Sequence, residues 1–478
     1  MDKNAKLYEK VYMHYRELIT EGKLAPGDKM PSIRSCVNEL SVSKTTAENA
    51  YFQLVADGYI YSRNKSGHYV TERLNHELTS KDDSVLTTDS PTANNSAPKA
   101  KNTGESSDLN DLISQIDFKY DLSVIGDDSE AFRFDLWQRY MKSALRNTDK
   151  LSSYGSPQGE YELREEISKH IRKAKNIYCS PDDIVIGAST QSLLMILLPI
   201  LKEKGYKTAS VPTEGFKRYE NVFKSYDVSV DIRNKNADII YVSPAHMTEW
   251  GELMSLKRRH EIASHSKNGH FIIEDDYQSE LNFSSRPSPA IYTLSNGENV
   301  AYIGSFSRVL LPSIRISFMV LPRELSLSYQ NVRNLYDQTA SKTEQIALCM
   351  FLRDEKLNSH IRSIRRLYFQ KREILTVICN MVCKNAFKIL GKPFETVLRK
   401  GECGTELAIT IYSNTDLLSD KDIAFLLESV RLKPNIQKKR DNSFNLIFSC
   451  GITGLDTLKA IQKEMENYTD ERTINAVF

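Results

Sequence analysis

Three segments of the sequence carry polar side chains that could form a ligand site, and two of them suit the binding of a small anion. The first, GASTQS at residues 187–192, brings small residues and hydroxyls to the start of a predicted helix, where backbone amides can hold a phosphate. The second, EDDYQSEL at residues 274–281, offers carboxylates and a tyrosine, and the third, GSFSRVLLPSIR at residues 304–315, offers serines and two arginines. Taken singly, the first is a weak signal and the second is better explained as a solvated acidic turn.

Each segment follows a short apolar run, and such runs alternate with helical patterns along the body of the chain. The runs lie at residues 184–186, 208–211, 239–242, 271–273, 300–303 and 316–321. This alternation predicts a mostly parallel sheet covered by helices. Because ligands of such sheets bind at the carboxyl ends of the strands, we expect the three segments at one sheet edge. Beyond residue 335, a long helix, strands at 407–412 and 444–448 and a final helix predict a smaller α+β lobe.

A separate unit, residues 1–75, precedes this body. It shows three amphipathic helical patterns, of which the second and third can be capped by Ser32 and Ser43. Two short β-type runs at 59–62 and 68–70 then predict a hairpin. Three helices followed by a hairpin is the order of a winged helix-turn-helix, whose third helix enters the major groove of DNA. The alternative is a three-helix protein-interaction module in which the same charges form a solvated face.

The residues expected to contact DNA lie at the starts of the second and third helices and on the hairpin. They are Arg34, Ser43, Lys44, Thr45, Thr46, Arg63, Lys65 and Gly67. Basic side chains at these places gain from the release of counterions and from the helix dipole. The net charge of +2, from 64 basic and 62 acidic residues, provides no bulk attraction to nucleic acid, so DNA binding must depend on this local patch.

The composition of the rest of the chain indicates where the domains are divided and in which cellular compartment the protein acts. Residues 76–114 are rich in Ser, Thr, Asn, Asp and Lys, which predicts a flexible linker between the unit at 1–75 and a body at 115–478. No apolar stretch is long enough to span a membrane, and the N-terminus does not resemble a secretory signal. Seven cysteines without a C-x-x-C pair indicate neither disulfides nor a metal site, and Cys379 and Cys383 are interpreted as core residues. We therefore expect a cytoplasmic protein.

Two resemblances cover nearly the whole chain apart from the linker. Residues 7–70, with PGDKMPSIR, SVSKTT and a wing containing SGHYV, resemble the DNA-binding domain of the GntR family of bacterial regulators. YGSPQGEYELREEI, GASTQS, EDDYQSEL and GSFSRVLLPSIR, in this order, resemble the fold-type I aminotransferase domain. A GntR-like head before such a body resembles the MocR/GabR-type regulators. The implied fold is a winged helix-turn-helix joined to an α/β aminotransferase-like domain with a small α+β C-terminal lobe.

This resemblance implies a site for pyridoxal phosphate. By that likeness, Ser189 and Thr190 hold the phosphate together with Ser305 and Arg315, and Asp275 pairs with the pyridinium nitrogen. Tyr277 approaches the ring hydroxyl and Phe216 stacks on the ring, while Ser307 and Arg308 complete the expected set.

The main departure from the family pattern is at residue 308. The family has S-x-S-K there, with the lysine forming the Schiff base, whereas this sequence has Arg308. A guanidinium stays protonated and is no amine nucleophile, so we expect transamination to be absent. Two alternatives remain. In the first, the phosphate-binding residues still hold pyridoxal phosphate or another anionic effector noncovalently, with help from Arg308. In the second, these residues no longer bind a ligand, and Arg308 pairs with Asp275 or another acid. Ala188 and Ser317 replace glycines, and the 243–251 loop lacks its usual Pro-Thr-Gly ending. Asn445 lies about where many relatives carry an arginine for the substrate carboxylate.

We interpret the chain as a bacterial transcriptional regulator that binds an operator in double-stranded DNA as a homodimer. Its body is expected to sense a small anionic effector, with pyridoxal phosphate held noncovalently as one candidate, and to be catalytically inactive. One alternative is a pyridoxal-phosphate-dependent aminotransferase that uses a displaced lysine such as Lys217. Another is a regulator whose body is a ligand-free dimer scaffold.

Overall fold

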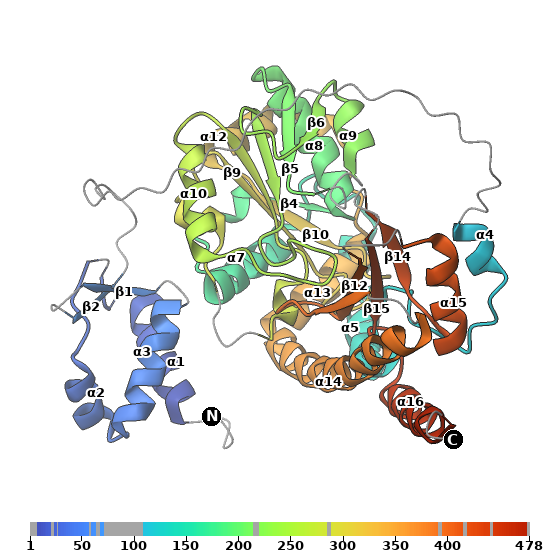
Figure 1. The fold of residues 1–478 in the computed structure, drawn as a ribbon. Coiled ribbons are helices and arrows are strands. Elements are labelled where there is room, and N and C mark those ends of the chain that lie inside the picture. The colour runs from blue at the N-terminus through green and yellow to red at the C-terminus, as the bar shows by residue number, and fades with distance from the viewer. Residues whose placement is uncertain are drawn as a thin grey trace.

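The computed structural model describes residues 7–20, 23–25, 27–56, 59–63, 67–70, 109–213, 219–283, 288–390, 394–413, 418–439 and 443–475. Figure 1 shows a small N-terminal head in blue, a large sheet covered by helices, and a C-terminal lobe in orange and red. The expected Phe216, Lys217 and Lys65 lie outside the described residues, as does the side chain of Arg63.

The head has the expected order of elements. Helices α1 (Leu7–Thr20), α2 (Ile33–Leu40) and α3 (Lys44–Ala56) precede strands β1 (Ile60–Arg63) and β2 (Gly67–Val70), which pair antiparallel. The Ser32 hydroxyl accepts from the Ser35 amide at 3.1 Å and caps α2, and the Ser43 hydroxyl accepts from the Thr46 amide at 3.1 Å at the start of α3. Ala47, Ala50, Tyr51 and Leu54 are buried where α3 packs on α1. The predicted winged helix-turn-helix is confirmed.

The large sheet has seven strands in the order β4-β10-β9-β8-β7-β5-β6. Their bounds are β4 (Ile184–Gly187), β5 (Thr208–Val211), β6 (Ser229–Ile232), β7 (Ile239–Val242), β8 (Phe271–Asp275), β9 (Val300–Ser305) and β10 (Ser317–Val320). Strand β10 is antiparallel to both β4 and β9, whereas β5 to β9 pair in parallel. The expected mostly parallel sheet is therefore confirmed, and β6, a partly exposed edge strand, is an addition to it.

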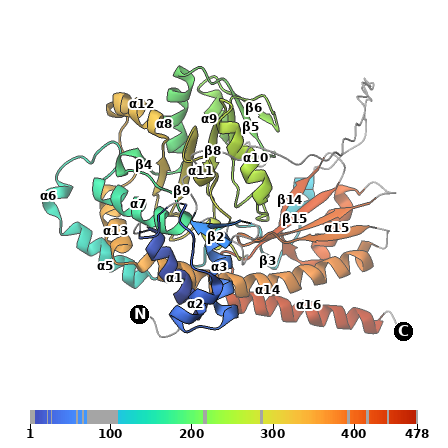
Figure 2. The same cartoon turned by 90° about the vertical axis from the view of Figure 1, so that its left-hand side faces the viewer.

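Helices cover both faces of this sheet (Figures 1 and 2). They are α5 (Phe134–Leu145), α6 (Thr148–Leu151), α7 (Tyr161–Lys175), α8 (Thr190–Glu203), α9 (Glu220–Lys224), α10 (Leu256–Ser266), α11 (Ile291–Leu294), α12 (Arg323–Val332) and α13 (Lys342–Arg353). Successive strand residues enter different cores: Ile186 and Ile272 belong to one apolar cluster, Val185 and Ile273 to the other. Both faces being buried explains why these strands read as continuous apolar runs.

The smaller lobe is built on a second sheet, in the order β11-β12-β15-β14. It contains α4 (Leu109–Ser114), β3 (Tyr120–Asp121), α14 (Lys356–Leu390), β11 (Glu395–Arg399), β12 (Glu406–Tyr412), α15 (Asp420–Val430), β13 (Leu432–Lys433), β14 (Asn435–Lys438), β15 (Phe444–Ser449) and α16 (Leu455–Asn475). In Figure 2, α14 and α16 lie side by side along this sheet. Short helical turns lie at Ser129–Ala131, Pro181–Asp183, Ser279–Leu281 and Arg333–Leu335.

One predicted boundary is wrong. Helix α4 falls inside residues 76–114, the range expected to form the flexible linker, yet its Leu109 is buried in the core of the smaller lobe and Ile113 packs against that core. Two apolar residues one helical turn apart supply enough burial to attach the segment. The body therefore begins earlier than its composition indicates.

The structure describes all seven cysteines of the chain. All seven cysteines are free, and Cys379 and Cys383 lie on α14 within or against the smaller lobe's core. Among the described residues, no helix has the length and apolarity to cross a membrane, and no cluster of histidine, cysteine and acidic side chains could hold a metal ion.

The packing predicts different costs for two isoleucines of the same sheet. Ile303 in central β9 is 0% exposed and Ile232 at the end of edge strand β6 is 37% exposed. We expect Ile303→Ala to lower the free energy of unfolding by about 2–5 kcal/mol, because it removes buried methyl groups and leaves a cavity. Ile232→Ala should cost less than about 1 kcal/mol. Urea unfolding followed by circular dichroism compares them, and equal losses would contradict the described core.

Candidate functional site

Strand register brings the three candidate segments to one edge of the large sheet. Ser317, the first residue of β10, lies opposite Gly187 at the end of β4 on one side and opposite Ser305 at the end of β9 on the other. Asp275, at the end of β8, is paired in register with Ile303 of β9, so the acidic segment starts at the same edge. The expected convergence of the three segments is therefore seen in the pairing of the strands.

The phosphate-binding side of the candidate site begins at the N-terminus of α8. Ser189 is the N-cap: its hydroxyl accepts from the Ser192 amide at 3.1 Å, and its own amide donates to the Ser192 hydroxyl at 3.0 Å. Thr190 is the first residue of this 14-residue helix. The positive end of the helix dipole therefore meets the sheet edge on which Ser317 and Ser305 lie.

Serines and an arginine occupy the neighbouring strand ends. The Ser317 hydroxyl donates to the Ser305 hydroxyl at 3.0 Å, and the Ser307 hydroxyl donates to the Ile314 carbonyl at 2.9 Å. Ser307 thus closes the loop that carries the two arginines. Arg315, two residues before Ser317, is exposed, and within the described part of the chain it takes part in no ion pair.

Asp275 is buried at 3% exposure and accepts a hydrogen bond from the hydroxyl of Tyr241 on β7 at 2.5 Å. Sequence reasoning did not select Tyr241, because a tyrosine within an apolar strand reads as a core residue. Tyr277 packs edge-on against His246, with ring centroids 5.1 Å apart. The buried hydroxyl of Ser243, which follows β7, has no hydrogen-bond partner among the described residues. A polar ligand at this strand end would satisfy it.

Arg308 does not pair with Asp275, the first acid considered for it. Its Nη1 lies 3.2 Å from Oδ1 of Asp127 and its Nη2 lies 3.6 Å from Oε1 of Glu406. With its side-chain oxygen turned toward the arginine, Gln278 accepts from Nε at 2.8 Å and from Nη2 at 2.5 Å. The expectation that Arg308 pairs with another acid is thus met by Asp127 and Glu406, neither of which the sequence marks.

These contacts keep Arg308 charged. Burial acts to lower the pKa of its guanidinium, but Tyr277, Asp127 and Glu406 act to raise it and the net shift is upward. Glu406 is held in turn by the amide and hydroxyl of Thr405, both at 2.8 Å. Because Glu406 starts β12 of the smaller lobe and Arg308 follows β9 of the large sheet, the guanidinium joins the two lobes.

Two lysines lie near the site, and each is ion-paired: Lys371 is buried and Lys175 is half-buried. Nζ of Lys371 on α14, which is 0% exposed, lies 2.5 Å from Oδ2 of Asp128 and 3.1 Å from the Gly451 carbonyl. Nζ of Lys175 lies 2.9 Å from Oδ2 of Asp276. Burial acts to lower the pKa of Lys175, yet Asp276 and Glu280 leave it raised, so this amine is protonated and a poor nucleophile.

The position expected to bind a substrate carboxylate is neutral. Asn445 of β15 is 1% exposed, and its side-chain oxygen accepts from the Thr410 hydroxyl of β12 at 2.9 Å. Two neutral groups that satisfy each other offer no charge to a carboxylate.

Most of the described residues expected to contact DNA are exposed on the head. Arg34, Ser43, Lys44 and Thr45 are exposed, and Thr46 is fixed by the Ser43 hydroxyl. Lys44 pairs with Glu48 one turn along α3, at 3.5 Å. Gly67 has φ of +108° at the start of β2, a backbone conformation that strongly favours glycine.

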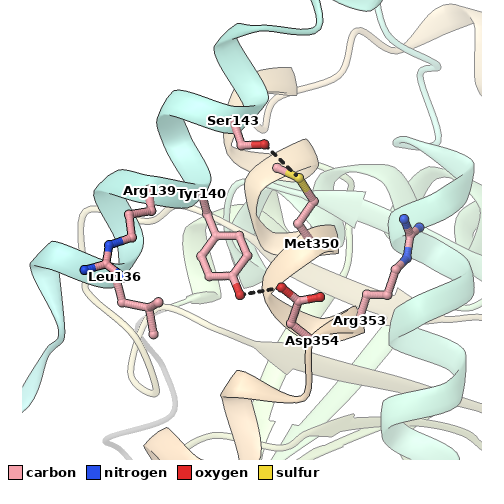
Figure 3. A pocket seen from close by; sticks show the side chains of 7 residues that line it. All are labelled: Leu136, Arg139, Tyr140, Ser143, Met350, Arg353 and Asp354. Carbon is pink, nitrogen blue, oxygen red and sulfur yellow. Dashed lines mark hydrogen bonds between the residues drawn. The ribbon is translucent and has the colours of Figure 1, made fainter.

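A hollow of 420 Å³ between α5 and α13 lies apart from these groups. Figure 3 shows the side chains that line it: Leu136, Arg139, Tyr140, Ser143, Met350, Arg353 and Asp354. The Tyr140 hydroxyl donates to Asp354 at 2.7 Å across it. None of the expected site residues lines this hollow, so the chemistry at the sheet edge, rather than this depression, defines the candidate site.

Asp127 makes the site sensitive to pH. Burial raises its pKa to about 6 and Arg308 lowers it only in part, whereas an aspartate in the unfolded chain has a pKa of about 4. The native state thus binds this proton more tightly, and the contribution of Asp127 to the free energy of unfolding falls as pH rises from about 4 through about 6. Asp127→Asn has no such proton. We expect its free energy of unfolding to rise relative to wild type by on the order of 3 kcal/mol across that window.

Urea unfolding of both proteins at several pH values between about 4.5 and 8 measures this difference. The exposed Asp149→Asn provides a matched control. A difference between Asp127→Asn and wild type that stays constant over the series would contradict the buried, destabilised carboxylate.

Two family models match the chain. That of the bacterial regulatory proteins of the gntR family matches residues 7–70, and that of aminotransferase class I and II matches residues 128–394. Among solved structures, the chain is similar to a multiple substrate aminotransferase from Thermococcus profundus, with a TM-score of 0.58 and 19% identity over 78% of this chain and 96% of that one. A kynurenine aminotransferase from Pyrococcus horikoshii has a TM-score of 0.57 and 19% identity, covering 77% of this chain and 96% of its own. These likenesses establish the fold.

Curated relatives match both units together. The uncharacterized HTH-type transcriptional regulator YhdI of Bacillus subtilis is 33% identical over 409 residues, which is 82% of each chain. The probable rhizopine catabolism regulatory protein MocR of Rhizobium meliloti is 26% identical over 398 residues, 79% of this chain and 78% of that one. This chain belongs to the MocR/GabR-type subfamily of the GntR family of bacterial transcriptional regulators, in which a winged helix-turn-helix is fused to an aminotransferase-like domain.

Proposed function

We propose that this transcriptional regulator senses a small anionic ligand through its aminotransferase-like body and does not catalyse transamination. The observation that carries the proposal is Arg308, which stands where the family has its Schiff-base lysine and whose guanidinium is engaged by Asp127, Glu406 and Gln278. A charged group held in this way supplies no amine to a carbonyl. As a DNA-binding regulator, the protein would act in the bacterial cytoplasm.

The groups that remain suit pyridoxal phosphate or another phosphorylated ligand held noncovalently. Ser189 and Thr190 at the start of α8, Ser305 at the end of β9 and Arg315 would hold the phosphate. Asp275 would face the pyridinium nitrogen, with Tyr241 fixing its carboxylate, and Tyr277 would lie near the ring hydroxyl. Pyridoxal phosphate supplies an aldehyde and an electron-withdrawing ring when it is bound. The unsatisfied hydroxyl of Ser243 supports a polar ligand at this edge.

The contacts of Arg308 favour a structural part for it within this binding site. Its guanidinium forms ion pairs with Asp127 and Glu406 and donates hydrogen bonds to Gln278, and these partners join the two lobes. Ser307 likewise supports the loop rather than the ligand. We therefore propose that Arg308 sets the distance between the lobes, while Arg315 provides the charge-assisted hydrogen bond to the anion.

The competing aminotransferase would need another lysine at the site. Lys175 and Lys371 are both engaged by buried aspartates, and Lys175 is held protonated by its neighbours. Lys175 therefore does not offer the neutral amine that covalent catalysis requires, and Lys371 is enclosed by Asp128 and the Gly451 carbonyl.

Regulation follows from the two-lobed body. Ligand binding at the sheet edge, beside the Arg308 contact that joins the two lobes, would favour one of their relative positions. In a homodimer this would reposition the two heads on paired DNA half-sites. Two heads in one assembly raise the effective concentration of the second head once the first is bound.

Titration with pyridoxal phosphate tests the ligand site. We expect saturable binding by absorbance, with no mass increase after borohydride reduction, because no amine at the site can form the reducible bond. Arg315→Met should weaken binding by about tenfold or more, since it removes a charged hydrogen bond to the phosphate. Arg323→Met, which alters an exposed arginine of α12, should bind as wild type does.

An intact aminotransferase treated in parallel shows that the reduction works. A reducible adduct on this chain would overturn the proposed loss of chemistry. Equal binding by Arg315→Met and Arg323→Met would remove Arg315 from the site, and no binding at all would leave the scaffold alternative.

The head predicts a separate result on DNA. Lys44→Ala should lower affinity for an operator, selected from random-sequence DNA with the wild-type protein, by about tenfold or more, because the ammonium lies at the exposed start of α3. Lys10→Ala, at an exposed position of α1, is the matched control and should keep wild-type affinity. Fluorescence anisotropy at fixed salt measures both. Equal affinities would favour the protein-interaction alternative for the head.

A further inference from the structure

A second hollow, of 250 Å³, lies where α14 meets loops of both lobes. It is lined by Phe369, Arg372 and Glu373 of α14, by residues 400–402, which follow β11, and by Phe283, which packs against the core of the large sheet. Pockets for drug-sized ligands measure about 300–1,000 Å³, so this hollow suits a smaller molecule. None of its lining residues belongs to the candidate site at the sheet edge.

The hollow contains a buried cation that has no counter-ion among the described residues. Arg372 is 2% exposed, its Nη2 donates to the Gly401 carbonyl at 2.5 Å, and its Nε has no hydrogen-bond partner in the described part of the chain. The adjacent Glu373 is paired instead with Nζ of Lys400 at 2.7 Å. Burial lowers the pKa of the Arg372 guanidinium. A carboxylate brought by a ligand would satisfy this cation.

Other buried arginines of the body are better satisfied. Arg259, 5% exposed, donates to three backbone carbonyls. Arg164, 6% exposed, donates to two carbonyls and to the carboxylate of Asp182. Arg308 reaches two carboxylates. With a single carbonyl as its partner, Arg372 therefore differs from arginines that only hold the fold together.

Two phenylalanine rings give the hollow an apolar wall. The guanidinium of Arg372 lies 4.9 Å from the ring centroid of Phe283, and the centroids of Phe283 and Phe369 lie 6.2 Å apart. Phe369 is 50% exposed, although it lies beside a charged group. An apolar group placed against it would be removed from water, and an aromatic one would gain further from the ring contact.

A carboxylate stands on the other side of the hollow. Glu402 is exposed, and its Oε2 accepts a hydrogen bond from the Leu253 amide at 3.2 Å. Within the described residues it forms no ion pair, because the neighbouring Lys400 is paired with Glu373. The hollow thus offers one cation, one anion and an aromatic wall. A free α-amino acid with an apolar side chain carries the complementary groups.

We propose that this hollow is a binding site for a free α-amino acid with an apolar side chain. The ligand's carboxylate accepts hydrogen bonds from Arg372, its ammonium faces Glu402, and its side chain lies against Phe369 and Phe283. The site is separate from the proposed pyridoxal phosphate site and does not depend on it.

Titration calorimetry of the full chain with L-phenylalanine tests the ligand class. We expect saturable binding of one molecule per chain. Phenylpropanoate, which lacks the ammonium, and phenylethylamine, which lacks the carboxylate, should each bind at least about tenfold more weakly, because each loses a charge-assisted hydrogen bond.

Exposed residues of the hollow provide variants that should fold normally. Phe369→Ala should weaken binding of L-phenylalanine by at least about fivefold, because it removes the apolar wall. Phe425→Ala, at a phenylalanine of α15 that is 55% exposed, is the matched control and should bind as wild type does. Glu402→Gln should also weaken binding, whereas Glu428→Gln at an exposed position of α15 should not.

Arg372→Gln removes the cation itself and should reduce binding below detection. Because it also deprives the Gly401 carbonyl of its donor, circular dichroism has to show that this variant is folded, and the exposed variants test the site if it is not.

Two further measurements locate the bound amino acid. Arg315→Met, which alters the sheet edge, should leave the affinity for L-phenylalanine unchanged, and saturating pyridoxal phosphate should not compete with it. Loss of binding in Arg315→Met but not in Phe369→Ala would overturn the proposal in favour of the sheet edge. Absence of saturable binding of both L-phenylalanine and L-leucine would overturn it altogether, and so would equal binding of the two analogues that lack one charge.

Discussion

The charged groups at the junction of the two lobes constrain the rest of the body. Adjacent aspartates, Asp127 and Asp128, each hold a buried cation from a different element: Arg308 after β9 and Lys371 on α14. Removing one partner of such a pair leaves a buried charge uncompensated, at a typical cost of about 3–5 kcal/mol. Arg308 reaches Glu406 on β12 as well, and Lys371 reaches the Gly451 carbonyl. The large sheet, the long helix and the smaller sheet therefore meet at one short segment of chain.

The site illustrates how a fold can be retained across large sequence divergence. The strand ends, the capped start of α8 and the buried Asp275 are those expected of the aminotransferase domain, and the solved aminotransferases share this fold at 19% identity. Arg308 lies where the family resemblance places a lysine, and the strands beside it pair as this fold requires. Function accordingly has to be argued from the site, residue by residue.

Sequence patterns predicted the elements that are buried on both faces and missed those at the periphery. β4, β8 and β9 are fully or almost fully buried and read as apolar runs. The edge strands β6, which is largely exposed, and β11, which is half-buried, have no such run. The strand ends could be predicted to converge because parallel strands share an edge. The partners of Arg308 could not, since Asp127 and Glu406 are distant in sequence and resemble ordinary polar residues. Helix α4 was not predicted because the composition around it is polar. Only its Leu109 and Ile113 pack in or against the core of the smaller lobe.

Because α14 is long, a small rotation at the lobe junction produces a large displacement at the helix's other end. Its 35 residues extend over about 50 Å, and it packs on α13 at the large sheet as well as on β12 and α16 in the smaller lobe. A helix of this length acts as a lever: a rotation of about 5° at one end displaces the other by about 4 Å. A small rotation of α14 at the lobe junction near Arg308 would thus move the other end of the helix by about the length of a side chain.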